Sequence, residues 1–167
     1  NAKLDILNKF REWVPNAKNN LFWENLLDSS YSRGDIRVNT RVKIEGTTTL
    51  GPHIDSQQEI IAGLIYCRHD SDDSQGGDLG LYRLKNEVGP HFMSKKRRIP
   101  YKYVELEKTI AYKKNTAVFF PNSLKAIHAV TPRGLGKFER RMINVSIELL
   151  GNKALWDMNL GIDVSLK

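Results

Sequence analysis

The sequence contains one cysteine, Cys67, among 167 residues, and no apolar run long enough to cross a bilayer. A single cysteine cannot form an internal disulfide. Because Cys67 lies within an apolar stretch, we expect a buried thiol in a reducing compartment. No signal peptide, low-complexity tract or internal repeat is visible. These absences predict a cytoplasmic, globular protein without a membrane partner.

Hydrophobic residues make up 40% of the chain, enough to argue against disorder and to build a core without disulfides. The length fits one domain, and we expect residues 1–167 to form it. Much of the net charge of +7 is local, and the segment 86–99 has the composition of a long basic loop. The simplest interpretation of this loop is a solvated surface. The alternative is that it contacts an acidic or phosphate-bearing substrate. The cations concerned are Lys95, Lys96, Arg97, Arg98 and Lys102, followed by Lys113 and Lys114.

Two segments near the start have the pattern of amphipathic helices. In the first, apolar residues recur at helical spacing from Leu4 to Val14, and Pro15 ends the pattern. A weaker version follows over residues 20–29. We expect these helices, at about residues 1–30, to support a sheet.

From Asp35 the apolar period changes to two, which is typical of a strand with one polar face. Ile36 and Val38 fall on one face of this strand, and Arg37 and Arg41 on the other. Many short strands without intervening helices predict a mostly β protein, a sandwich or jelly roll, with its core at about 35–150. The further strand-like runs are 59–67, 78–84, 101–112, 116–120, 124–130 and 140–150.

The first candidates for chemistry are His53 and Asp55. They lie two residues apart in an extended segment, so both side chains project from one face. His128 lies in a later strand-like run, where alternation turns it toward an apolar interior. Taken alone, His128 is better explained as a core histidine that is hydrogen-bonded to the backbone. His53 and Asp55 alone are similarly weak evidence for a metal site. Together, two imidazoles and one carboxylate make a facial set that leaves three positions open on a six-coordinate iron(II).

With the motifs around these residues, the sequence resembles the iron(II)- and 2-oxoglutarate-dependent oxygenases, particularly their prolyl-hydroxylase-like branch. The resemblance runs from about Arg37 to Leu149, in matching order and spacing. It implies a double-stranded β-helix, a form of jelly roll, with iron held by His53, Asp55 and His128. The motifs are His53-Ile54-Asp55, Leu64-Ile65-Tyr66 with Gly76-Gly77-Asp78-Leu79, Phe119-Phe120-Pro121-Asn122, His128-Ala129-Val130-Thr131-Pro132 and Arg140-Arg141-Met142-Ile143-Asn144-Val145.

The family pattern also places a basic residue about ten positions after the second histidine, where it binds a carboxylate of 2-oxoglutarate. Arg140 and Arg141 both fit. Alternation favours Arg140, because its face continues with polar residues, whereas that of Arg141 continues with core-type residues such as Ile143. A guanidinium matches a carboxylate in a bidentate pair. Tyr66 matches a position that hydrogen-bonds the same carboxylate in relatives, and an ordinary strand tyrosine is an equal alternative.

The resemblance implies oxidative decarboxylation of 2-oxoglutarate by O2 to succinate and carbon dioxide, coupled to hydroxylation of a substrate carbon. We expect the substrate to be a protein side chain or a small molecule. Arg37 and Arg41, on the polar face of the first strand, are candidate substrate-binding residues, although a solvated strand edge is favoured.

Three other functions compete with hydroxylation. One is a cupin-like metalloenzyme without a keto-acid cosubstrate, which would share the barrel but have no need of Arg140. A nucleic-acid demethylase of the same chemistry is less favoured, because few aromatic residues accompany the basic loop to stack on a base. A non-catalytic jelly-roll binding module is an alternative from a different class, and the complete set of site residues argues against it.

The remaining residues of interest have simpler interpretations. His69 and His91 are expected at the surface, and Gly76-Gly77 in a turn that needs positive φ. Trp13, Trp23 and Trp156 are expected to pack in the interior.

Overall fold

The computed structural model describes residues 2–9, 11, 28, 30–41, 51–85, 98–134, 136–151 and 155, with the backbone alone for 38–41. Within these ranges the protein is mostly β, as the alternating sequence predicts. The elements are α1 (Ala2–Lys9), β1 (Ser32–Arg41), β2 (Glu59–Tyr66), β3 (Leu79–Leu84), the 3₁₀ turn η1 (Tyr101–Tyr103), β4 (Val104–Ile110), β5 (Thr116–Pro121), β6 (Ile127–Val130) and β7 (Arg140–Leu149).

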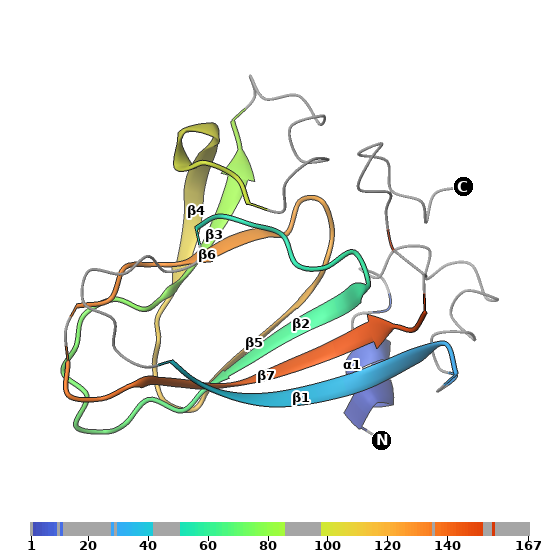
Figure 1. Ribbon diagram of the computed structural model, residues 1–167, viewed down its shortest axis with the longest axis horizontal. Coiled ribbons are helices and arrows are strands. Elements are labelled where there is room, and N and C mark those ends of the chain that lie inside the picture. Colours follow the sequence, from blue (N-terminus) through green and yellow to red (C-terminus); the bar gives the residue numbers. More distant parts are fainter. Residues whose placement is uncertain are drawn as a thin grey trace.

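The described strands form two antiparallel sheets (Figure 1). The larger sheet has the order β1-β7-β2-β5 and the smaller one β4-β3-β6. The last strand, β7, lies between β1 and β2, so the C-terminal strand of the core pairs with the two most N-terminal strands. This arrangement is consistent with the expected double-stranded β-helix.

One face of the larger sheet points toward the smaller sheet. Tyr66 and Met142 lie opposite each other on β2 and β7, so their side chains project to the same side. Both belong to a buried apolar cluster that includes Leu79 of β3. Arg140 and Asn144 lie two residues on either side of Met142, so alternation puts them on this inward face too.

The opposite face of the larger sheet is covered by α1. Leu7 of α1 is fully buried in a cluster that contains Ile61 of β2 and Ile147 of β7. The Lys3 ammonium donates a hydrogen bond to the Ser32 carbonyl at 2.9 Å, which ties the helix to the start of β1. Figure 1 shows α1 beside these strands.

The N-terminal prediction is confirmed for one helix only. α1 ends at Lys9, before the predicted limit at Pro15. The second predicted helix, over 20–29, lies almost wholly outside the described residues. Within the described residues, the structure therefore shows one supporting helix where two were predicted.

The first strand differs from its prediction in position and in burial. β1 begins at Ser32, three residues before Asp35, because pairing with β7 starts there. Ile36, assigned to the apolar face, is 69% exposed on this edge strand. Edge strands pack against fewer neighbours, so alternation alone overstates their burial. The later positions of this pattern, Val42 and Ile44, lie outside the described residues.

Two of the other predicted strands are shorter than expected. The run 101–112 begins with η1 and is extended only from Val104 to Ile110. In the run 124–130, a turn precedes β6, which begins at Ile127. The remaining four runs, 59–67, 78–84, 116–120 and 140–150, match β2, β3, β5 and β7 to within one residue at each end.

The prediction of a buried cysteine is wrong, because Cys67 is exposed. It follows β2 directly after Tyr66, whose side chain is 1% exposed and faces inward. The next residue of an extended chain projects to the opposite side. His69 is exposed, as predicted, and its ring stacks on Phe138 with centroids 4.1 Å apart.

The predicted turn at Gly76-Gly77 is confirmed, with φ of 79° and 78°. A Cβ on Gly76 would lie 1.9 Å from the Pro132 carbonyl oxygen, so the close approach also requires glycine. The other segments with predicted roles are outside the described residues, namely most of the basic loop with His91, and Trp13, Trp23 and Trp156.

Within the described part of the chain, no helix combines the length and the apolar character needed to span a membrane. The assignment of residues 1–167 to one domain stays a prediction.

Candidate metal centre

His53 and His128 lie on neighbouring extended segments and are bound to each other through the backbone. The His53 N–H donates to the His128 carbonyl at 3.0 Å, and the His128 N–H donates to the His53 carbonyl at 2.9 Å. Residues paired in this way project to the same side of a sheet. Their rings are accordingly neighbours, with centroids 4.3 Å apart. A local backbone pair thus joins two residues that are far apart in the sequence.

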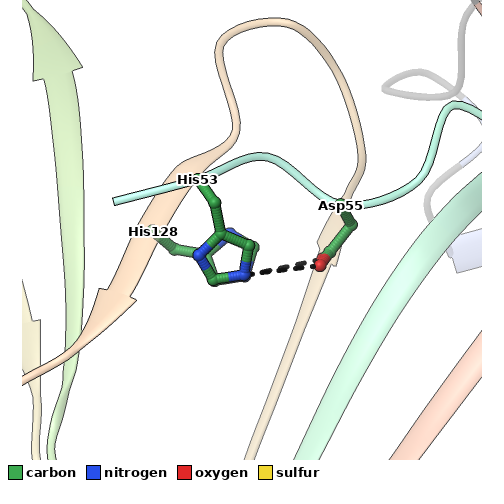
Figure 2. A group of neighbouring side chains, drawn as sticks. All are labelled: His53, Asp55 and His128. Atoms are coloured by element: carbon green, nitrogen blue, oxygen red, sulfur yellow. Dashed lines mark ion pairs between the residues drawn. The ribbon is translucent and has the colours of Figure 1, made fainter. Parts of the chain in front are cut away.

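Asp55 completes the group (Figure 2). One of its carboxylate oxygens, Oδ1, lies 3.8 Å from His53 Nε2, and the other, Oδ2, lies 3.5 Å from His128 Nε2. Ile54, between the two ligands of the first motif, is 1% exposed and packs into the core. The predicted alternation of this segment is therefore correct. One nitrogen or oxygen from each of the three residues lies within 4.8 Å of the others.

The other ring nitrogen of each histidine is occupied by the backbone. His53 Nδ1 is 2.9 Å from the Gly51 carbonyl oxygen, and His128 Nδ1 is 3.0 Å from that of Ala126. A carbonyl oxygen only accepts, so Nδ1 carries the proton in both rings. In neutral rings the Nε2 lone pairs then point toward Asp55. Histidine ligands of metals are oriented in the same way.

The pKa of His53 is lowered, first by burial and then by the neighbouring His128 and by Arg98, against the opposite effect of Asp55. A neutral His53 cannot form an ion pair with Asp55. The close approach of an imidazole lone pair and a carboxylate is then repulsive unless a cation lies between them. The donor set of two imidazoles and one carboxylate therefore fits a divalent metal ion.

Asn122 fixes the segment that carries Asp55. Its side chain is fully buried, and its amide nitrogen donates to the Ser56 and Glu59 carbonyls at 2.8 and 2.9 Å. In the sequence, the motif Phe119-Phe120-Pro121-Asn122 assigns no partner to this side chain. The contact joins the end of β5 to the loop before β2, and no local period in the sequence indicates it.

Arg140, the first residue of β7, is 6% exposed, and its Nε donates to the Gly77 carbonyl at 2.8 Å. Its guanidinium carbon lies 5.2 Å from the centre of the Tyr66 ring. Arg141 is exposed. Alternation thus chose the inward residue correctly, but the expectation that Arg141 faces the core is wrong. The apolar face of β7 becomes buried only further along, at Ile147 and Leu149, which share a cluster with Leu7 of α1.

Tyr66 completes this end of the interior. Its hydroxyl is buried, and its ring lies beside the Arg140 guanidinium. Burial raises the pKa of Tyr66, and the positive charge of Arg140 partly offsets the increase. A buried guanidinium beside a buried hydroxyl is a suitable binding site for a carboxylate, so these residues fit one end of a dicarboxylic acid.

The candidate substrate residues are placed less favourably. Arg37 shares the inward face of Asn144, its partner on β7, but its side chain is 61% exposed and pairs with Asp35 and Glu148. The backbone of Arg41 pairs with that of Arg140, and its side chain is outside the description. The structure brings His53, Asp55 and His128 together and Arg140 beside Tyr66, but Arg37 belongs to a surface ion-pair network.

A two-sheet β fold with a His-Asp-His facial site and a buried arginine defines a class of metal-dependent enzymes that act on or with a carboxylic acid. The comparisons agree. Residues 40–147, more than half of the chain, match the family described as the 2OG-Fe(II) oxygenase superfamily. The chain belongs to this superfamily. No curated protein and no solved structure matches it. Iron(II) and 2-oxoglutarate are therefore the cofactors that the family implies, with His53, Asp55 and His128 as candidate iron ligands.

Proposed function

We propose that the protein is a hydroxylase that binds iron(II) through His53, Asp55 and His128 and a carboxylate of 2-oxoglutarate through Arg140 and Tyr66. The observation that carries this proposal is the convergence of two Nε2 lone pairs on the Asp55 carboxylate, each fixed by an Nδ1 bond to the backbone. When bound, the two cofactors supply an oxidising centre that consumes O2, releases succinate and carbon dioxide, and hydroxylates a substrate carbon.

The chain's own residues have three tasks in this reaction. The imidazoles and the carboxylate hold the metal from one side and leave the other side to 2-oxoglutarate and O2. Arg140 and Tyr66 fix the far end of the keto acid, so that its reactive end faces the metal. The apolar cluster of Tyr66, Leu79, Tyr112 and Met142 lines the interior and excludes water from it.

The first test is succinate production from 2-oxoglutarate by protein that is loaded with iron anaerobically and then exposed to air. We expect slow turnover in the wild type even without a primary substrate. His53→Ala and Arg140→Ala should abolish it. His69→Ala and Arg141→Ala are matched controls, because both side chains are exposed and lie outside the site, and they should retain the wild-type rate. Wild-type protein that makes no succinate and binds neither cofactor would instead support a non-catalytic binding module.

We propose a protein side chain or a small molecule as the primary substrate, as in the prolyl-hydroxylase-like branch. One contact supports an acidic group on it. Arg98 is exposed, and its backbone pairs with His53, so its side chain starts on the face that carries the triad. The Ile99 N–H donates to the Pro52 carbonyl at 2.6 Å and holds this segment against the metal motif. A cation beside the metal site would attract an anionic substrate.

The same contact keeps nucleic-acid demethylation as the second candidate, since phosphates are anionic. Binding of single-stranded oligonucleotides separates the two. Several phosphate contacts would give an affinity that falls steeply with salt and a weaker slope in Arg98→Gln. The protein or small-molecule proposal requires no measurable oligonucleotide binding at physiological salt, and succinate production that increases with an acidic peptide or small acid but not with its neutral analogue.

A further inference from the structure

Tyr112 lies in the interior beside Arg140, two residues after the end of β4. Its side chain is 1% exposed. Its ring centre is 5.1 Å from the Arg140 guanidinium carbon and 5.2 Å from the centre of the Tyr66 ring, which it meets edge-on. The two residues that we assign to the keto acid thus share one aromatic neighbour.

The Tyr112 hydroxyl is bound to the backbone of β7. It accepts a hydrogen bond from the Arg141 N–H at 2.8 Å and donates one to the Arg141 carbonyl at 3.2 Å. A single hydroxyl therefore binds both backbone groups of the residue that follows Arg140, and the Cys67 N–H donates to the same carbonyl at 3.0 Å. The Tyr112 contact thus helps to fix the direction in which Arg140 leaves the backbone.

The backbone of Tyr112 is held at a second point that also controls Arg140. Its N–H donates to the Asp78 carboxylate at 2.7 Å. Asp78 follows Gly77, whose carbonyl accepts the bond from Arg140 Nε. Tyr112 is consequently bound on both sides of Arg140. Its hydroxyl binds the main chain next to Arg140, and its N–H binds Asp78, which follows the glycine that accepts the guanidinium hydrogen bond.

Two more arginines lie near the Tyr112 ring. The guanidinium carbons of Arg68 and Arg133 lie 5.5 and 5.9 Å from the ring centre. Arg68 also donates to the Tyr112 carbonyl at 3.1 Å, and Arg133 pairs with the buried Asp72 at 2.7 Å. Rotation of the ring away from Arg140 would disturb this group, so the ring has one position.

We propose that Tyr112 is a positioning residue that holds the Arg140 guanidinium in place for the distal carboxylate of 2-oxoglutarate. The proposal rests on the proposed function, because it assumes that Arg140 binds this carboxylate. Among the described contacts of Tyr112, none is with His53, Asp55 or His128. Its loss should therefore affect recognition of the distal carboxylate alone.

The test compares two keto acids of equal length by calorimetric titration into manganese(II)-loaded protein without oxygen. 2-Oxoglutarate has the distal carboxylate, and 2-oxopentanoate has a methyl group in its place. Tyr112→Phe keeps the ring and removes the hydroxyl, and we expect its Kd for 2-oxoglutarate to increase about five- to tenfold. Its Kd for 2-oxopentanoate should remain that of the wild type. Tyr82→Phe, a half-buried tyrosine in the other apolar cluster, is the control and should change neither.

An unchanged Kd for 2-oxoglutarate in Tyr112→Phe would overturn the proposal, and so would an equal weakening of both keto acids, which indicates general damage. Thermal unfolding in the absence of ligand identifies a variant that has failed to fold. Asp78→Ala, which removes the acceptor of the Tyr112 N–H, is then the second variant, and it should also weaken binding of 2-oxoglutarate more than that of 2-oxopentanoate. If the wild type binds neither keto acid, the proposed function itself fails and the role of Tyr112 fails with it.

Discussion

Glu59 and Glu148 lie directly opposite each other on β2 and β7, at the end of the sheet that carries the Asp55 segment. Burial, followed by the negative charges of Asp55 and Glu148, raises the pKa of Glu59 to about 8. Glu59 is therefore protonated at neutral pH in the folded protein, although the same residue is ionised in the unfolded chain.

The first prediction is a stability that decreases with pH because of Glu59. The folded state holds a proton that the unfolded chain releases above its ordinary pKa of 4.5. This contribution is complete below about pH 4.5 and is lost as the pH increases through about 8. The slope is at most about 1.4 kcal/mol per pH unit, and partial exposure reduces it. Glu59→Gln should unfold in denaturant with a free energy that varies less than that of the wild type between pH 5.5 and 8.5. Parallel curves for the two proteins would contradict the assignment.

The second prediction concerns metal binding. Manganese(II) or iron(II) at about 100 times its Kd should add about 2.7 kcal/mol to stability, or roughly 5–10 °C in Tm for a chain of this size. His128→Ala removes one of three ligands and should lose the increase. His69→Ala, which changes an exposed histidine, should keep it. A thermal shift of the same size in all three proteins would place the metal elsewhere.

The third prediction concerns the buried carboxylate behind Tyr112. The Asp72 side chain is inaccessible to solvent, and although burial opposes its charge, the bonds from Ser74 and Arg133 outweigh this and lower its pKa. Asp72→Asn should destabilise the protein by about 3 kcal/mol, because the Arg133 charge loses its partner. Asp70→Asn is the control, since Asp70 pairs with Lys114 at the surface and should have little effect on denaturant unfolding. Equal effects of the two substitutions would show that the Asp72 network carries no special stability.

The fourth prediction concerns Asn122. Asn122→Ala removes two hydrogen bonds to the carbonyls of the Asp55 segment and should cost about 1–3 kcal/mol. Because these bonds also fix Asp55, the variant should bind manganese(II) more weakly in calorimetric titration. Asn115→Ala, in an exposed turn, provides the comparison for metal affinity. A lower free energy of unfolding with an unchanged Kd for manganese(II) would limit Asn122 to a structural role.

The sequence predicted those parts of the site that depend on local geometry. His53 and Asp55 share a face because they are two residues apart in an extended chain, and the same alternation distinguishes Arg140 from Arg141. Cys67 could have been placed correctly in the same way, because it follows the inward Tyr66. Its apolar neighbours suggested burial instead.

The parts that the sequence did not predict depend on contacts between distant segments. Tyr112 and Asn122 lie just beyond the ends of β4 and β5, and their importance comes from contacts with Asp78, Arg141 and Glu59. The exposure of Ile36 similarly depends on strand order, since β1 is an edge strand. Strand order is a property of the whole fold, and alternation within one strand does not contain it.

Each imidazole of the triad is oriented by a carbonyl only two residues earlier in its own segment, Gly51 for His53 and Ala126 for His128. The orientation of each ring is therefore fixed by a hydrogen bond within its own short segment of the chain. Little conformational entropy remains to be lost when a metal arrives, so capture should be limited by diffusion and dehydration of the ion. The protein would then select its metal by ligand type and charge, with little dependence on folding around the ion.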